Sequence, residues 1–216
     1  MKAALVTGGS RGIGLALARR LASEGYALTL VSRSPEKAAR ELGCASFAGD
    51  LRDEDVVRGA VAHHVAEHGR LDVVVNNAGV GMGQDAGELK TSRVDVQLAL
   101  DLRTPILFYR EALPHLGEGA WVINVASVAG VDGQPWLSVY SAAKAGLIAY
   151  TEAMNKELGS RGIRSCAICP GTVDTELTAY EGAPRDRLIL VDDIAEALSF
   201  LLRLSPNCLV ERLVLR

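Results

Sequence analysis

A hydroxyl, a phenol and an amine lie close together in the second half of the chain, at Ser127, Tyr140 and Lys144. Tyr140 and Lys144 are four residues apart, so on a helix they lie on one face, about one turn from each other. A phenol ordinarily has a pKa near ~10, and a neighbouring ammonium group lowers that pKa because it favours the phenolate. Such a pair suits proton transfer near neutral pH. The spacing alone is weak evidence, since it also occurs by chance on many surface helices.

A glycine-rich turn near the start of the chain has the composition of a phosphate-binding loop. It follows a short apolar run at 2–7, expected to be a buried strand, and reads GGSRGIG at 8–14. A helical apolar period follows and ends at Gly25. Between a strand and a helix, glycines allow close backbone approach, and the first helical N–H groups attract a pyrophosphate. The spacing is T-G-x-x-x-G-x-G rather than G-x-G-x-x-G, and the competing interpretation is an ordinary loop.

The second expected strand, at 26–32, bears on the choice of nucleotide. In dinucleotide-binding units an Asp or Glu near the end of this strand holds the adenosine ribose 2′-hydroxyl. Here Arg33 and Ser34 follow the strand, without a carboxylate. A guanidinium suits a 2′-phosphate because it binds phosphate oxygens in bidentate fashion, and Arg11 could supply a second cation. We therefore expect NADP(H) to be preferred over NAD(H); the alternative is that Arg33 is a solvated loop charge.

Apolar runs and helical periods alternate along the rest of the chain. Further strands are expected at 44–48, 71–76, 120–126, 163–169 and 209–215, and helices at 35–42, 53–68, 91–116, 138–159 and 191–202. Pro105 should kink the long helix at 91–116 or mark a helix boundary. No linker or repeat interrupts the alternation. It predicts one α/β domain, 1–216, with a doubly wound parallel sheet of about seven strands and helices on both faces.

Ligands of such sheets bind beyond the carboxyl ends of the strands. Glycine and polar signals are expected at these ends, at Gly8, Arg33, Asp50, Asn77, Ser127 and Pro170. Their convergence on one rim indicates a nucleotide site more strongly than any single pattern does.

Composition and charge exclude several classes of function. The net charge is −3, and no basic run or basic–aromatic cluster indicates a nucleic-acid partner. No apolar stretch reaches the ~18 residues of a membrane span, and the N-terminus does not resemble a signal peptide, so we expect a cytoplasmic protein without a membrane partner.

Cysteines and histidines do not indicate a metal site. Cys166 and Cys169 lack a second pair or a histidine partner, and residues three apart on a strand point to opposite faces, so we expect buried structural thiols and no bound metal. His64 and His68 have helical spacing in a polar segment, where a solvated helix face is expected.

Together these motifs resemble the short-chain dehydrogenase/reductase family over nearly the whole chain. The residues that carry the resemblance are TGGSRGIG at 7–14, Asp50-Leu51, NNAG at 76–79, Ser127, YSAAK at 140–144 and PGTVDT at 170–175. Six motifs in the right order and spacing make the assignment specific. It implies a single-domain Rossmann fold and an oxidoreductase that reduces a carbonyl through hydride transfer.

The resemblance also implies the role of each motif. Tyr140 is the general acid in reduction, Lys144 lowers its pKa and holds the nicotinamide ribose, and Ser127 hydrogen-bonds the substrate carbonyl. The cofactor-binding residues would be Gly8, Ser10, Arg11, Gly12, Ile13 and Gly14 at the pyrophosphate, Arg33, Ser34, Asp50 and Leu51 at the adenosine, Asn77, Ala78 and Gly79 beside it, and Tyr140, Lys144, Pro170, Gly171, Val173 and Thr175 at the nicotinamide.

Two departures from the family pattern affect the expected chemistry. Many members have a fourth catalytic residue, an Asn before the fifth strand, and Asp101 occupies that place here. An ionised Asp only accepts hydrogen bonds whereas an Asn also donates, so we expect a shifted pH optimum, unless the alignment is off by a residue or two. The chain is also shorter than is usual, which predicts a short substrate lid between Thr175 and the helix at 191. Trp136, Leu137 and Met82 are candidate pocket-wall residues.

Three functions are compatible with this sequence. The first is an NADP(H)-dependent reductase of a ketone, aldehyde or 3-oxoacyl thioester. The second is an NADP(H)-binding regulator with little turnover, against which the intact Ser127, Tyr140 and Lys144 argue. The third, an epimerase or dehydratase, is disfavoured because such relatives are usually longer. The resemblance further implies a homodimer or homotetramer formed through the helices at 91–116 and 138–159.

Overall fold

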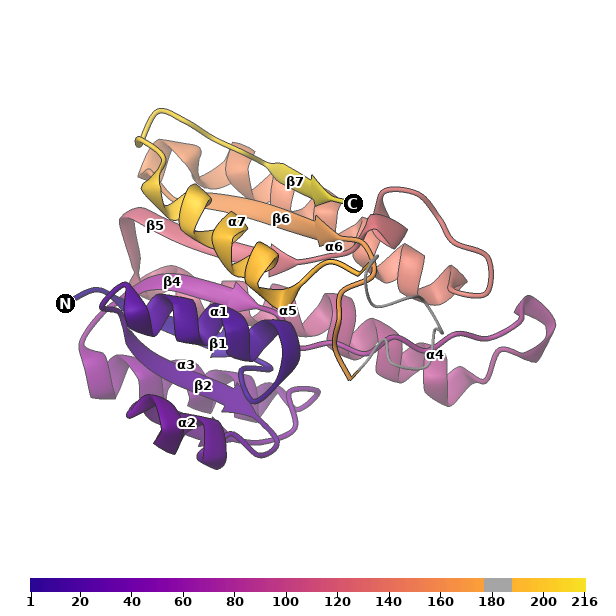
Figure 1. Cartoon of the computed structure of the whole chain (residues 1–216), viewed down its shortest axis with the longest axis horizontal. Coiled ribbons are helices and arrows are strands. Elements are labelled where there is room, and N and C mark those ends of the chain that lie inside the picture. Colours follow the sequence, from indigo (N-terminus) through magenta and orange to yellow (C-terminus); the bar gives the residue numbers. More distant parts are fainter. Residues whose placement is uncertain (177–187) are drawn as a thin grey trace.

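Parallel strands form one central sheet in the computed structural model, which describes residues 1–176 and 188–216 (Figure 1). In the described part of the chain the sheet has seven strands in the order β3-β2-β1-β4-β5-β6-β7. They are β1 (Ala3–Thr7), β2 (Ala27–Ser32), β3 (Ala45–Ala48), β4 (Leu71–Asn76), β5 (Leu116–Val125), β6 (Arg164–Pro170) and β7 (Arg212–Leu215). The predicted α/β fold with a doubly wound parallel sheet is confirmed.

Helices cover both faces of the sheet because its strands are apolar on both sides. Along β1, Ala4 and Val6 belong to one core cluster and Leu5 to the other, as the alternation of side chains on a strand requires. The first cluster lies under α1 (Gly12–Ser23), α2 (Glu36–Leu42) and α7 (Val191–Arg203). The second lies under α3 (Glu54–His68), α5 (Thr104–Ala112) and α6 (Ser138–Leu158).

The order of strands reverses between β1 and β4, which pair directly through Leu5 and Val74. Chain connections therefore leave the two strands toward opposite faces, and open α/β sheets bind ligands beyond the carboxyl ends of the strands at such a reversal. The glycine turn after β1 and the N-N-A-G segment after β4 both lie there. Figure 1 shows α4 (Thr91–Leu98) projecting beyond this same end of the sheet.

The long helix expected at 91–116 is divided into segments. After α4 the backbone makes a π-helical turn, η2 (Ala99–Arg103), before α5 begins, and a 3-10 turn, η3 (Leu113–His115), ends the helical region. Pro105 is the second residue of α5, which directly follows the π-helical turn, so the change from one helical segment to the next falls at the proline, as predicted. Leu116 already belongs to β5, which therefore begins earlier than predicted.

The prediction for the histidines of α3 is wrong. His64 is fully buried, and its Nδ1 lies 2.9 Å from the hydroxyl of Thr29 on β2. His68 contacts the same hydroxyl through Nε2 at 3.1 Å. Although the sequence of α3 is polar, one face of the helix packs on the sheet through the imidazoles of His64 and His68. Cys166 and Cys169 are buried and fall in different core clusters, which confirms the structural interpretation.

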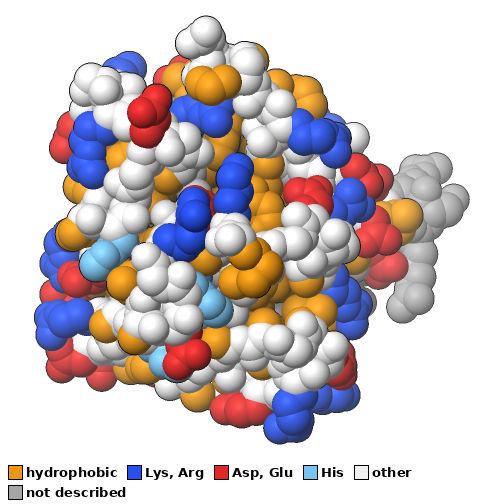
Figure 2. Space-filling view, turned by 90° about the vertical axis from the view of Figure 1, so that its left-hand side faces the viewer, with side chains coloured by type: hydrophobic (Ala, Val, Ile, Leu, Met, Phe, Trp, Pro, Cys, Tyr) orange, Lys and Arg blue, Asp and Glu red, His pale blue; other side chains and the backbone are white. Residues whose placement is uncertain are grey.

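The outer surface carries charges of both signs. Figure 2 shows them interspersed over the face at the amino ends of the strands. Among the described residues, no helix is both long and apolar enough to cross a membrane.

Candidate active site

The glycine turn after β1 is shaped by contacts that exclude side chains. Gly8 has φ +64°, in the left-handed region that favours glycine. A Cβ on Gly14 would lie 2.3 Å from the carbonyl oxygen of Gly8, so the first turn of α1 packs directly on the loop. Arg11, the N-cap of α1, makes no side-chain capping hydrogen bond. The first N–H groups of α1 therefore remain available to an anion, and this cradle fits a dinucleotide pyrophosphate.

Side-chain hydrogen bonds lock the turn to the end of β4. Asn77 donates through Nδ2 to the carbonyl oxygens of Thr7 at 3.1 Å and Gly8 at 3.3 Å. The hydroxyl of Thr7 in turn accepts from the backbone N–H groups of Asn77 and Ala78. Sequence reasoning did not assign Thr7 a role in the site, although its signal was a hydroxyl at the last position of a buried strand.

The expected adenosine end of the site combines exposed arginines with one carboxylate. Arg33 and Ser34 follow β2 directly and are exposed. Asp50 is bound by Arg52, with Oδ2 and Nη2 2.5 Å apart, and this hydrogen bonding lowers the pKa of Asp50 to about 2. Arg11, expected as a second cation for the 2′-phosphate, lies 3.0 Å from Glu176. Both arginines are thus exposed, and Arg11 is paired with a carboxylate.

Tyr140 and Lys144 occupy the first two turns of α6, as predicted. Tyr140 is half-buried and Lys144 is buried, with its Nζ 5.6 Å from the centroid of the phenol ring. The Lys144 ammonium donates a 3.0 Å hydrogen bond to the carbonyl oxygen of Val125, the last residue of β5. The carbonyl oxygen of Val125 thus holds the Lys144 ammonium in place near the Tyr140 ring.

Ser127 reaches the same region from the end of β5. It caps the 3-10 turn η4 (Val128–Gly130), and its Oγ accepts from the N–H of Ala129 at 3.1 Å. Gly130 packs against the backbone of Lys144 so closely that a Cβ there would lie 2.6 Å from the Lys144 carbonyl carbon. This contact seats η4 on α6 and brings Ser127 to the side of the helix that carries Lys144.

Asp101 lies at the centre of η2 and faces Lys144. Its side chain is fully buried, and Oδ1 is 3.5 Å from Lys144 Nζ. Oδ1 also accepts from the N–H of Val80 at 3.1 Å, and Oδ2 accepts from the side chain of Gln97. The structure therefore places Asp101 beside Lys144.

Burial and charge oppose each other in this pair. Burial raises the pKa of Asp101, and the nearby Lys144 only partly offsets this. Burial acts to lower the pKa of Lys144, but the Asp101 carboxylate and the Tyr140 phenol outweigh it and hold that pKa above its usual value. Lys144 therefore stays a cation through the physiological range.

Gly79 lies against both members of the pair. A Cβ at this position would be 2.3 Å from Asp101 Oδ1, so only glycine fits between the N-N-A-G segment and η2. The requirement for glycine at the end of this motif follows from the buried carboxylate beside it.

The segment after β6 lies at the same carboxyl edge of the sheet. The N–H of Gly171 donates to Leu215 on β7 at 2.8 Å, and Val173 pairs with Ile189. Pro170, Gly171, Val173 and Thr175 thus lie at the carboxyl end of β6, as predicted. The short lid expected after Thr175 falls on 177–187 and lies outside the described residues.

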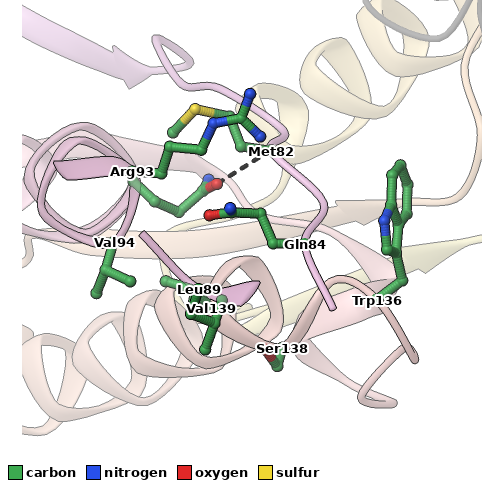
Figure 3. Close-up of a pocket in the computed structure, with 9 residues that line it drawn as sticks. Met82, Gln84, Leu89, Arg93, Val94, Trp136, Ser138 and Val139 are labelled. Carbon is green, nitrogen blue, oxygen red and sulfur yellow. Dashed lines mark hydrogen bonds between the residues drawn. The ribbon is translucent and has the colours of Figure 1, made fainter. Parts of the chain in front are cut away.

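A shallow hollow lies between α4, the loop after β4 and the start of α6 (Figure 3). Met82, Leu89, Arg93, Trp136 and Val139 line it, so two of the three predicted pocket-wall residues are present and Leu137 is not. Figure 3 shows Arg93 and Met82 at one side and Trp136 at the other. Trp136 is the one non-glycine residue with positive φ in the described chain, at +68°, which is a strained conformation typical of functional loops.

Gln97 is a residue of this region that sequence reasoning missed. Its position four residues before Asp101 on a helical segment was the available signal, because residues at that spacing lie on one helix face.

Known proteins resemble this chain in sequence and in fold. The family model described as short chain dehydrogenase matches residues 2–186. The chain belongs to the short-chain dehydrogenase family. Its members are oxidoreductases that bind nicotinamide cofactors and act on small molecules. A 3-oxoacyl-(acyl-carrier-protein) reductase of Chlamydia muridarum is 34% identical over 224 residues, which cover 93% of this chain and 89% of the relative.

Solved structures of this family superpose closely. A short-chain dehydrogenase from Burkholderia cenocepacia J2315 in complex with NADP has a TM-score of 0.92 and 30% identity, covering 99% of this chain and 96% of that one. A 3-ketoacyl-(acyl-carrier-protein) reductase from Brucella melitensis complexed with NADH has a TM-score of 0.91 and 30% identity, covering 99% and 95%. These neighbours bind different nicotinamide cofactors.

Proposed function

We propose that this protein is an NADP(H)-dependent reductase that converts a ketone, an aldehyde or a 3-oxoacyl thioester to an alcohol. The observation that carries the proposal is the pairing of half-buried Tyr140 with buried Lys144, whose Nζ lies 5.6 Å from the phenol centroid. When bound, the nicotinamide supplies the hydride. The residues of this chain then have to hold the carbonyl in place and give its oxygen a proton.

Each residue of the group has its own part in the proposed reaction. Tyr140 donates its hydroxyl proton to the carbonyl oxygen in reduction and accepts a proton in oxidation. Ser127 donates a hydrogen bond to the same oxygen and stabilises the negative charge that develops there. Lys144 favours the phenolate left behind and binds the ribose hydroxyls. Asp101 acts from behind Lys144 and keeps it a cation.

The proposed cofactor site follows the carboxyl rim of the sheet. The first turn of α1 would bind the pyrophosphate, through Gly8, Ser10, Arg11, Gly12, Ile13 and Gly14. The exposed guanidinium of Arg33 and the hydroxyl of Ser34 would bind a 2′-phosphate, which supports NADP(H) over NAD(H). Asp50 and Leu51 would contact the adenine, residues 77–79 the adenosine side, and Pro170, Gly171, Val173 and Thr175 the nicotinamide.

A 3-oxoacyl thioester is the first substrate to test, because the relatives from Chlamydia muridarum and Brucella melitensis are named for that activity. The purified protein is mixed with NADPH and a panel of 3-oxoacyl thioesters, ketones and aldehydes, and absorbance at the nicotinamide band is followed. We expect NADPH oxidation with at least one class. Tight NADPH binding without oxidation by any carbonyl would instead support the regulatory alternative.

We also propose that the protein is a cytoplasmic homodimer or homotetramer. Ala142, Ala145 and Ala149 are exposed along one face of α6, where small side chains allow a second helix to approach closely. Light scattering after size exclusion should give two or four times the 22.9 kDa chain mass. A monomer at micromolar concentration would contradict the proposal.

A further inference from the structure

Gln97 is a long polar side chain in a place where water cannot reach it. It lies in α4 one turn before Asp101, and 1% of its surface is exposed. A buried amide needs partners for two N–H donors and one carbonyl acceptor, because an unpaired polar group is costly there. Its contacts therefore identify its task.

All the hydrogen-bonding groups of this amide are used. Oε1 accepts from the backbone N–H of Met82 at 3.1 Å, the bond drawn as a dashed line in Figure 3. That bond orients the amide, since an N–H can donate only to the oxygen. Nε2 then faces two acceptors, the carbonyl oxygen of Val80 and Oδ2 of Asp101, in close contact with both.

We infer that Gln97 is a positioning residue, whose amide holds Asp101 ionised and directed at Lys144 and ties it to the loop at 80–82. The inference rests on the proposed function for its catalytic meaning. The effect of Gln97 on the ionisation of Asp101 can be measured directly, whether or not the protein turns over a substrate.

The charges around Asp101 make this support necessary. Lys144 faces it from α6, and Lys144 is itself near Tyr140 and Cys169. Burial favours the neutral carboxyl, whereas N–H donors favour the carboxylate. Oδ1 has the N–H of Val80 and the ammonium, whereas among the described residues the donor to Oδ2 is Gln97. Without that donor the carboxyl should retain its proton to higher pH.

The test follows the Asp101 carboxyl by NMR in protein labelled at the aspartate carboxyl carbon. The Asp101 signal is identified by its loss in Asp101→Asn. In Gln97→Met, which keeps the length but removes the amide, we expect the titration midpoint to rise by about one pH unit, a tenfold gain in proton affinity. Gln134→Met is the matched control, because Gln134 is exposed and its side chain bonds only a loop carbonyl.

A second variant keeps the inference testable if Gln97→Met does not fold. Gln97→Glu retains the shape but sets two carboxylates together, so one proton should be held to still higher pH. Kinetics give a separate readout: the acidic limb of the kcat profile should move upward with the NMR midpoint in both variants. In an Asp101→Asn background the same substitutions should leave the profile in place.

An unchanged Asp101 midpoint in both variants would overturn the inference, even if activity fell, because Gln97 would then be only structural. A shifted midpoint in a protein that never oxidises NADPH would support the action of Gln97 on Asp101. That outcome would contradict only the proposed reductase function.

Discussion

At the scale of single residues, the proposed site pairs Tyr140 as the acid with Lys144, whose ammonium faces the buried carboxylate of Asp101. The ion pair of Asp101 and Lys144, 3.5 Å apart, puts a carboxylate where the resemblance to the family leads us to expect an Asn. An Asn would leave Lys144 with burial as the main influence on its pKa. The charge state of the lysine is therefore the property that Asp101 controls.

Asp101→Asn should move the pH dependence of catalysis. The raised pKa of Lys144 depends on the carboxylate, so without it burial lowers that pKa. We expect the alkaline limb of the kcat profile to shift toward neutral pH by about one unit, since reduction needs the ammonium beside the phenol. Stopped-flow NADPH oxidation between pH 6 and 10 measures it, and a superimposable profile would count against this account.

Arg33→Ser should reverse the cofactor preference. The guanidinium is exposed next to the end of β2, and no carboxylate follows that strand. Losing a charged contact to a 2′-phosphate should cost about 2 kcal/mol, or ~30-fold in kcat/KM for NADPH, with little change for NADH. Arg93→Ser, at the distant hollow, should leave the ratio unchanged. If the wild-type protein prefers NADH to NADPH, that result contradicts the proposed role of Arg33 at the 2′-phosphate.

At the scale of elements, turns between regular segments position the groups that are proposed to act on the cofactor and the substrate. The π-helical turn η2 presents Asp101, the turn η4 presents Ser127, and the glycine turn presents the start of α1. Each is held by a contact that admits no extra atom. Substitutions at these contacts should therefore act on function and stability together.

Gly14→Ala should damage both the fold and nucleotide binding. The added Cβ would lie 2.3 Å from the Gly8 carbonyl oxygen and 2.4 Å from the Asn77 amide, so α1 must move away from the loop. We expect a loss of about 3 kcal/mol in the free energy of unfolding and weaker NADPH binding. Gly87→Ala adds the same atom in open space and should match the wild type by urea denaturation. Equal stability of the two variants would argue against the tight turn.

At the scale of the whole molecule, the fold was largely predictable because apolar runs fix the strands and the helical period fixes α1, α3, α6 and α7. The rule for strand ends then brought Gly8, Asn77, Ser127 and Pro170 to one edge of the sheet. Other features have no sequence signal of their own. A π-helical turn looks like any helix, and the buried imidazole of His64 follows from how α3 lies on β2, which a polar sequence does not reveal.

His64 should make the stability of the molecule fall in acid. Burial, helped by His68, lowers the pKa of His64 to about 4. The unfolded chain, with a histidine pKa near ~6.5, binds the proton more readily, so stability is full above that value and declines as pH falls toward 4. The loss should approach about 3 kcal/mol. The free energy of unfolding, measured with urea, should change less between pH 7 and 4 in His64→Gln than in the wild type. In the control His115→Gln, where the histidine is exposed, the decline should remain.

The proposed reaction depends on the transfer of a proton from Tyr140 to the substrate oxygen. Tyr140→Phe removes only the hydroxyl, and NADPH binding can be followed separately by the fluorescence of the nicotinamide. We predict that NADPH oxidation with the best carbonyl falls by at least ~10³-fold while the Kd for NADPH changes less than about twofold. Near-normal oxidation in Tyr140→Phe would contradict the claim.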